Sequence, residues 1–152
     1  MQKIQFHNFD RKPALVKKGA LKTFIEKLFL LEKKPLDSLA YIFCSDDHLL
    51  NFNSEFLKHD FYTDVITFDL SSDDSGIIGE VYLSIDRIKE NAKAEKVSFN
   101  EELHRVIFHG ALHLCGYKDK KKEDRLIMRT MENRYLAIYF QNKQKGFSRE
   151  TV

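Results

Sequence analysis

The sequence predicts an α+β fold in which a mixed four-stranded sheet packs against about five helices. Short apolar runs of strand length alternate with longer segments whose apolar residues recur at helical spacing. One run is apolar throughout, as expected for a strand covered on both faces. The last two strands are joined by a short connection, so one of the four strands must be antiparallel.

The first half of the chain predicts a strand, a helix and a second strand. Residues 4–9 form a short strand candidate. After Pro13, apolar residues at spacings of three and four predict an amphipathic helix that ends before Pro35. Residues 39–44, Leu-Ala-Tyr-Ile-Phe-Cys, form the second strand. This order of elements predicts a parallel crossover.

The middle of the chain predicts one more helix and two more strands. Ser45 or Asp46 can cap the helix. Residues 63–70 are rich in β-branched and aromatic residues, which favour a strand. Residues 71–76 have turn composition, and residues 77–85 then alternate between apolar and polar, as in a strand with one buried face.

Two helices complete the predicted fold. Ser98 and Glu101 have the spacing of a capping box at a helix start, and Gly116 marks the end of that helix. A closing helix begins near Glu123, with Ile127, Met131, Tyr135 and Ile138 as its expected inner stripe. We expect the polar tail from residue 143 to fray.

The helix that ends at Gly116 carries the most informative pair of residues, His109 and His113. Side chains four residues apart lie on one face of a helix, close enough to bind one metal ion. A turn at Gly116 can carry Asp119 to the same ion, and such a set leaves coordination positions open, as in catalytic zinc sites. Each buried histidine can instead bond a nearby carbonyl, and the residues alone leave both interpretations open.

Composition indicates one ordinary domain over residues 1–152, with 43% hydrophobic and 32% charged residues. No apolar run approaches the ~20 residues that span a bilayer, and the N-terminus lacks the apolar core of a signal peptide. We therefore expect a cytoplasmic protein without a membrane partner, and a monomer. Cys44 and Cys115 lie in apolar segments and are expected to be reduced core residues.

The net charge of +2 does not by itself predict a nucleic-acid partner. A group of lysines nevertheless surrounds Asp119, where it could attract phosphates; these are Lys118, Lys120, Lys121 and Lys122. A lysine run is also typical of a simple solvated surface.

Residues 109–117 match the His-Gly-x-Leu-His-Leu-x-Gly-Tyr signature, and the chain thereby resembles the YbeY family of bacterial metal-dependent endoribonucleases. Upstream blocks also resemble that family; they are Leu50-Asn51, residues 63–68 and Gly79-Glu80. The resemblance implies that His109 and His113 bind a metal ion, usually zinc. It also implies single-stranded RNA as substrate, near the 3′ end of small-subunit rRNA, with roles in rRNA maturation and ribosome quality control on the small ribosomal subunit.

Two positions depart from the family pattern. Asp119 stands where the family has a third histidine; aspartate can bind zinc, and its charge could broaden the choice of metal towards manganese or iron. Leu57 stands where the family has an arginine. The adjacent Lys58 could contact a phosphate, although lysine lacks the bidentate fork of arginine. Lys58, Lys118 and Lys120 are our candidates for binding RNA.

These residues suggest a mechanism in which a water activated at the metal attacks phosphorus. The helix is zincin-like, but Gly110 occupies the place of the glutamate that acts as general base in zinc proteases with His-Glu-x-x-His. Glu80 is our candidate for the general base, although it could be an ordinary strand carboxylate. Asp64 could orient a metal-binding histidine.

Three other classes of protein remain possible from the sequence. A metallopeptidase would use the same ion but lacks its glutamate at Gly110. A ferrous oxygenase also uses two histidines and a carboxylate, usually in a β-barrel. A protein that binds ribosomal RNA without cleaving it would explain both the family likeness and the altered residues, and it is the leading alternative.

Overall fold

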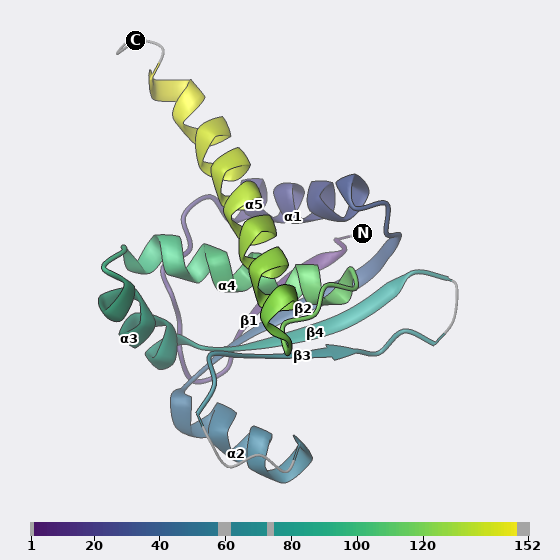
Figure 1. The fold of residues 1–152 in the computed structure, drawn as a ribbon, viewed down its shortest axis with the longest axis vertical. Helices are drawn as coiled ribbons and strands as arrows, with labels where there is room; N and C mark the ends of the chain where they lie inside the picture. Colours follow the sequence, from purple (N-terminus) through teal and green to yellow (C-terminus); the bar gives the residue numbers. More distant parts are fainter. Residues whose placement is uncertain (1, 58–61, 73–74, 149–152) are drawn as a thin grey trace.

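The computed structural model of the protein describes residues 2–57, 62–72 and 75–148. Within these residues the α+β prediction is confirmed: four strands form one mixed sheet, and five helices pack around it (Figure 1). The elements in chain order are β1 (Ile4–Asn8), α1 (Lys18–Leu31), β2 (Leu36–Cys44), α2 (Asp46–Leu57), β3 (Val65–Asp69), β4 (Ile77–Ser84), α3 (Ile85–Glu95), α4 (Phe99–Leu114) and α5 (Lys122–Ser148).

The strand order in the sheet is β1-β2-β4-β3. Strands β1, β2 and β4 are parallel, and β3 pairs antiparallel to β4, as the short connection between them predicts. The crossover from β1 through α1 to β2 is parallel, also as predicted. Because β3 is the last strand in this order, it forms an edge of the sheet.

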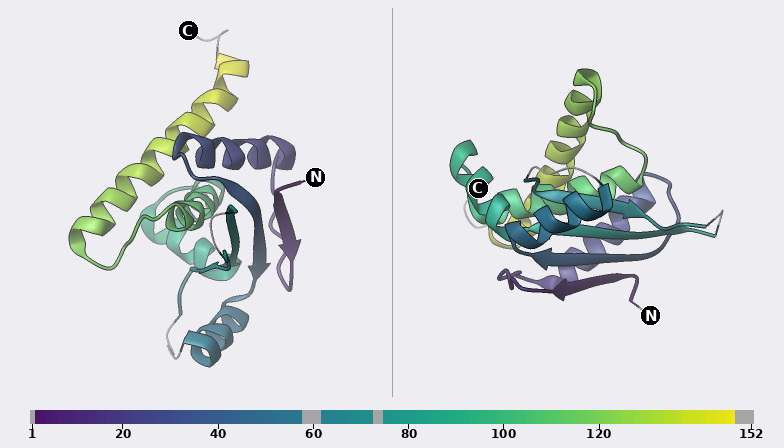
Figure 2. Two further views of the ribbon diagram at one scale, coloured as in Figure 1. Left: turned by 90° about the vertical axis from the view of Figure 1, so that its right-hand side faces the viewer. Right: turned by 90° about the horizontal axis from the view of Figure 1, so that it is seen from below.

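The sheet separates the helices into two groups, with α1 and α4 above it and α2 below it in the view of Figure 1. Two further views show α4 packed between the sheet and α5 (Figure 2). Eleven of the sixteen residues of α4 are buried, so α4 is a core helix. A smaller cluster below the sheet joins α2 to the other face through Cys44, Leu49 and Ile66.

Three boundaries differ from the prediction. Strand β2 begins at Leu36. Ile85 begins α3 and does not end the preceding strand, because the Ser84 hydroxyl accepts a hydrogen bond from the Arg87 N–H and caps a new helix. The sequence pattern predicts no element in that segment. Helix α5 continues to Ser148, since Lys and Gln are good helix formers.

Both cysteines are buried and free, as predicted. Burial raises the pKa of the Cys44 thiol, and likewise that of the Cys115 thiol, to about 12, so both are structural rather than reactive groups. None of the helices in the described chain combines the length and the apolar character needed to cross a membrane.

Candidate metal centre

The last turn of α4 presents His109 and His113 side by side. Their rings lie 4.6 Å apart in an edge-to-face arrangement. The helix then closes in a Schellman motif: the Tyr117 N–H donates to the Leu112 carbonyl at 3.1 Å, and Gly116 adopts a φ of 109°. A residue with a side chain would be strained at that φ, so glycine permits the reversal that leads to Asp119.

The structure brings the three predicted ligand side chains together. The Oδ2 atom of Asp119 lies 3.2 Å from Nε2 of His109 and 3.1 Å from Nε2 of His113. A tetrahedral zinc ion with bonds of 2.0–2.1 Å holds its ligand atoms roughly 3.3 Å apart, close to the observed separation. Among the described residues, this group could hold a metal ion.

The other ring nitrogen of each histidine already has a partner. Nδ1 of His109 donates to the Glu132 carboxylate at 2.6 Å, and Nδ1 of His113 donates to the Tyr117 carbonyl at 2.9 Å. Since these oxygens can only accept, each Nδ1 carries a proton, and the Nε2 of a neutral ring offers a lone pair. Both lone pairs then face one carboxylate oxygen of Asp119, which is repulsive unless a proton or a metal ion lies between them.

The electrostatic setting of His109 favours positive charge at this point. Burial works against the charged ring, but the hydrogen bond to Glu132 and the carboxylates of Glu132, Asp119 and Asp64 raise the pKa of His109 above its ordinary value. The same carboxylates would attract a metal cation.

Glu132 is a residue of the candidate site that the sequence did not predict. Its side chain is 7% exposed and also accepts from Arg105 Nη1 at 3.0 Å, while Arg129 Nη1 lies 3.7 Å away. The expected inner stripe of α5 was partly wrong: Ile127 is 52% exposed. The residues that are buried are Met128, Glu132, Tyr135, Leu136 and Tyr139. The stripe was predicted from apolar residues alone, so it excluded Glu132. The signal that could have identified Glu132 is its spacing, four residues after Met128 and three before Tyr135, which places it on the buried side of the helix.

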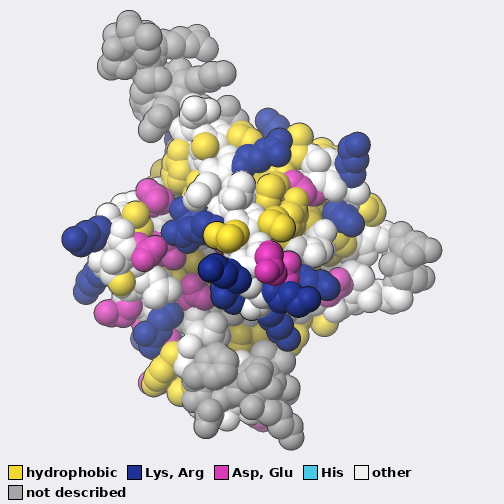
Figure 3. Space-filling model, in the orientation of Figure 1, with side chains coloured by type: hydrophobic (Ala, Val, Ile, Leu, Met, Phe, Trp, Pro, Cys, Tyr) yellow, Lys and Arg dark blue, Asp and Glu magenta, His cyan; other side chains and the backbone are white. Residues whose placement is uncertain are grey.

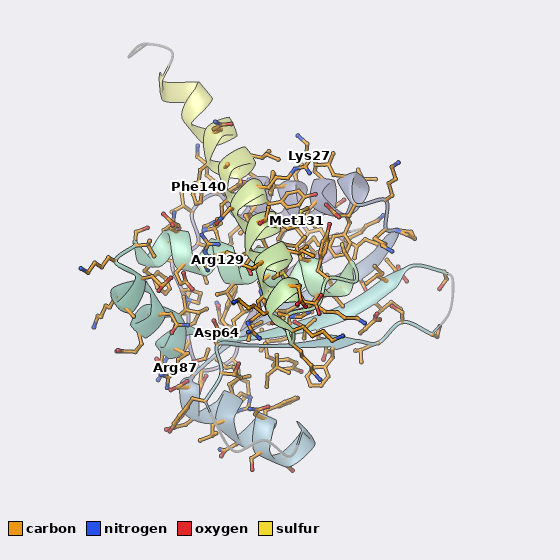
Figure 4. All side chains as sticks on the ribbon, viewed as in Figure 1. Lys27, Asp64, Arg87, Arg129, Met131 and Phe140 are labelled. Atoms are coloured by element: carbon orange, nitrogen blue, oxygen red, sulfur yellow. The ribbon has the colours of Figure 1, made fainter. Side chains whose placement is uncertain are left out.

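The metal-binding group opens into a cavity of about 700 Å³ between α4, the edge strand β3 and the start of α5. Asp64 lies near the start of β3 and Arg129 projects from α5 (Figure 4). Five carboxyl groups and three Lys or Arg side chains line the cavity. The lining therefore has an excess of negative groups until a cation binds. Asn53 of α2 also lines the cavity and is 2% exposed. Asn51, from the Leu50-Asn51 block that resembles the family, is exposed and does not line the cavity.

Comparisons with known proteins show the family to which the chain belongs. The family described as Endoribonuclease YbeY matches residues 5–139. The chain belongs to this family. An Endoribonuclease YbeY of Cytophaga hutchinsonii is 42% identical over 135 residues, covering 89% of this chain and 94% of the relative. One of Flavobacterium psychrophilum is 47% identical over 116 residues, covering 76% and 82%.

A solved structure has the same fold. The solution structure of TM1509 from Thermotoga maritima superimposes with a TM-score of 0.61 at 27% identity. The match covers 96% of this chain and 95% of that one. The likeness of fold thus extends over the sheet as well as the metal helix.

Glu80 is not part of the cavity of this YbeY-family chain. Strand β4 passes beneath α4, but alternate residues of a strand point to opposite faces. Val81 faces Gly110 on α4, so Glu80 points to the other face, where its carboxylate accepts from the Tyr82 hydroxyl at 3.0 Å. The predicted general base is therefore on the wrong side of the sheet.

Asp64 does line the cavity, although it is not the orienting partner of a histidine; Glu132 and the Tyr117 carbonyl fill those places. Burial raises the pKa of Asp64, an effect that the nearby His109 opposes. The Asp64 carboxylate accepts from Asn91 at 3.2 Å.

Two of the three predicted RNA-binding lysines, Lys118 and Lys120, lie within the described residues, beside Asp119. Lys120 lines the cavity, and Lys118 and Lys120 line a second, smaller hollow beside Asp119. Lysine and arginine side chains also gather over the start of α5 in the space-filling view (Figure 3). Lys58 lies outside the described residues.

Proposed function

We propose that the protein is a metal-dependent endoribonuclease, a hydrolase that cleaves single-stranded RNA within the chain. The observation that supports it best is the convergence of two histidine Nε2 atoms on one Asp119 oxygen inside an open cavity. The names of its relatives specify the reaction class. We further propose rRNA as the substrate, cut near the 3′ end of the small-subunit rRNA during maturation and quality control.

In this proposal His109, His113 and Asp119 hold one zinc ion, with manganese or iron as alternatives because Asp119 is charged. When bound, the ion would acidify a water and polarise a phosphoryl oxygen. Glu132 and the Tyr117 carbonyl fix the two imidazoles in the tautomer that leaves each Nε2 free to bind.

Other residues of the cavity would handle the proton and the RNA chain. Asp64 replaces Glu80 as our candidate proton acceptor, because its carboxyl lines the cavity and burial raises its pKa. Arg129 and Lys120 would bind the flanking phosphates, with Lys118 and Lys58 further along the strand. We expect a cytoplasmic monomer that meets its RNA on the small ribosomal subunit.

Two other functions compete with this one. A protein that binds rRNA without cleaving it would use the same cavity, and the residues Asp119 and Leu57 favour that alternative. A metallopeptidase is less favoured, because Gly110 packs directly on Val81 and leaves no room for a catalytic glutamate.

The deciding experiment compares cleavage of a labelled single-stranded RNA by metal-loaded wild type, His113→Ala and His7→Ala. His7 is exposed on β1, at the end of the sheet opposite to β3, so its variant controls for the loss of any histidine. We expect His113→Ala alone to lose cleavage. Equal cleavage by all three would point to a contaminating nuclease and reject the catalytic function. RNA binding without cleavage in every sample would favour the non-cleaving alternative.

A further inference from the structure

Glu32 at the end of α1 joins three separate parts of the fold. The Tyr117 hydroxyl, from the loop between α4 and α5, donates to Oε1 of Glu32 at 2.8 Å. The Tyr135 hydroxyl of α5 donates to Oε2 of the same carboxylate. Both carboxylate oxygens are therefore engaged by groups that come from the two segments following the metal helix. Glu32 itself does not line the cavity.

Tyr117 connects this carboxylate to His113. Its N–H donates to the Leu112 carbonyl at 3.1 Å and its own carbonyl accepts from Nδ1 of His113 at 2.9 Å. The residue is thus fixed at both backbone groups and at its hydroxyl. Its position determines where the acceptor for His113 lies, and the chain reaches Asp119 only two residues later.

Tyr135 connects the same carboxylate to His109. It is 1% exposed and lies nearly one helical turn after Glu132 on the buried side of α5. Glu132 accepts from Nδ1 of His109 at 2.6 Å. The hydrogen bond from the Tyr135 hydroxyl to Glu32 therefore fixes the rotation of α5 about its axis, and its position along that axis, at the turn that carries Glu132.

We propose that Glu32 is a positioning residue for the metal centre, which holds the hydrogen-bond acceptors of both histidines through Tyr117 and Tyr135. None of these three residues belongs to the group that would hold the metal ion. This inference rests on one part of the proposed function, namely that His109, His113 and Asp119 bind a metal ion. Groups that orient metal-binding histidines typically change metal affinity by 10–100-fold when they are lost.

The test measures zinc affinity by competition with a chromophoric chelator for Glu32→Gln, Tyr117→Phe and Tyr41→Phe. Tyr41→Phe is the matched control, because the Tyr41 hydroxyl is buried and donates to the Ile107 carbonyl of the metal helix at 2.9 Å, away from both histidine partners. We expect about tenfold weaker zinc binding in Glu32→Gln and Tyr117→Phe. Tyr41→Phe should lose stability but keep wild-type affinity.

Wild-type affinity in both Glu32→Gln and Tyr117→Phe would overturn the inference, as would an equal loss in Tyr41→Phe. A second readout is the His113 Nδ1–H signal of the zinc-loaded protein, which should exchange faster with water in Glu32→Gln than in Tyr41→Phe. Zinc binding without RNA cleavage would refute the proposed function and leave the inference standing. A wild type that binds no metal ion would overturn both.

Discussion

Gly110 and Val81 form a close contact between the metal helix and the sheet: a Cβ atom on residue 110 would lie 2.7 Å from Cγ1 of Val81. The Val81 side chain is short, β-branched and fully buried, so it cannot move aside. The glycine that interrupts the protease-like pattern is therefore needed for packing, and it determines how near α4 lies to β4.

Gly110→Ala should destabilise the protein by about 1–3 kcal/mol, because the added methyl overpacks the contact with Val81. Gly19→Ala is the matched control, since a Cβ there meets no atom within 4 Å and alanine favours the helix. Urea unfolding of the two variants should show changes of opposite sign. A neutral Gly110→Ala would mean that α4 can shift away from the sheet.

Glu132→Ala should lower both stability and metal affinity. Arg105, whose side chain is 10% exposed, would lose its 3.0 Å partner and keep only Glu102, at 3.9 Å, so the loss should stay below the about 3–5 kcal/mol that a fully unpaired buried charge costs. Glu132→Gln keeps an amide oxygen that can accept a hydrogen bond from either Arg105 or His109. Its free energy of unfolding should therefore fall less than that of Glu132→Ala. If Glu132→Ala retained wild-type zinc affinity, Glu132 would have no role in orienting His109.

Asp119→His should increase the preference for zinc over manganese, since it replaces a hard carboxylate by an imidazole. Competition of the two metals for the apo-protein, with bound metal measured by mass spectrometry, gives the ratio directly. Asp119→Asn, which removes the charge, should instead weaken the binding of both metals. An unchanged ratio in Asp119→His would show that Asp119 is not a ligand.

Arg129→Ala should weaken RNA binding and reduce the slope of log affinity against log salt by about 0.7, the value for one phosphate contact on a single strand. Arg134→Ala is the control, because Arg134 is exposed on the same helix and does not line the cavity. Equal effects in both variants would indicate a general charge effect rather than a contact made by Arg129.

Asp86→Asn should destabilise the protein near neutral pH and have little effect in acid. Arg11 binds the Asp86 carboxylate at 2.9 Å and holds its pKa below the ordinary value, against the opposing effect of burial. A carboxyl with a lowered folded-state pKa stabilises the protein above its unfolded pKa, and this is lost as the pH falls through the folded value. Urea unfolding at pH 7 and near pH 3 measures the difference between wild type and variant, and an identical difference at both values would contradict the assignment.

The elements that could be predicted are those whose signals are local in sequence. The cap at Ser98, the pair His109 and His113 and the reversal at Gly116 all lie within one short segment, so spacing alone indicates their geometry. Helix α3 was missed because only Ile85, Ile88 and Ala92 of its residues are buried, which gives a weak apolar pattern.

The rest of the site depends on contacts that spacing does not encode. Glu132 lies 23 residues from His109, and Glu32 lies 85 residues from Tyr117, so only the packed fold brings them together. The prediction for Glu80 has a different reason for its outcome. Strand β4 lies near the metal helix, as expected, but successive side chains of a strand point to opposite faces of the sheet, and Glu80 points away from the helix.

All four strands precede residue 85, whereas all three candidate metal ligands follow residue 108. During synthesis the residues of all four described strands therefore leave the ribosome before the first ligand, and the partner of His109 follows later still. A polypeptide released early would contain the sheet without the cation site. The candidate metal centre is thus completed only after every strand of the sheet has been synthesised.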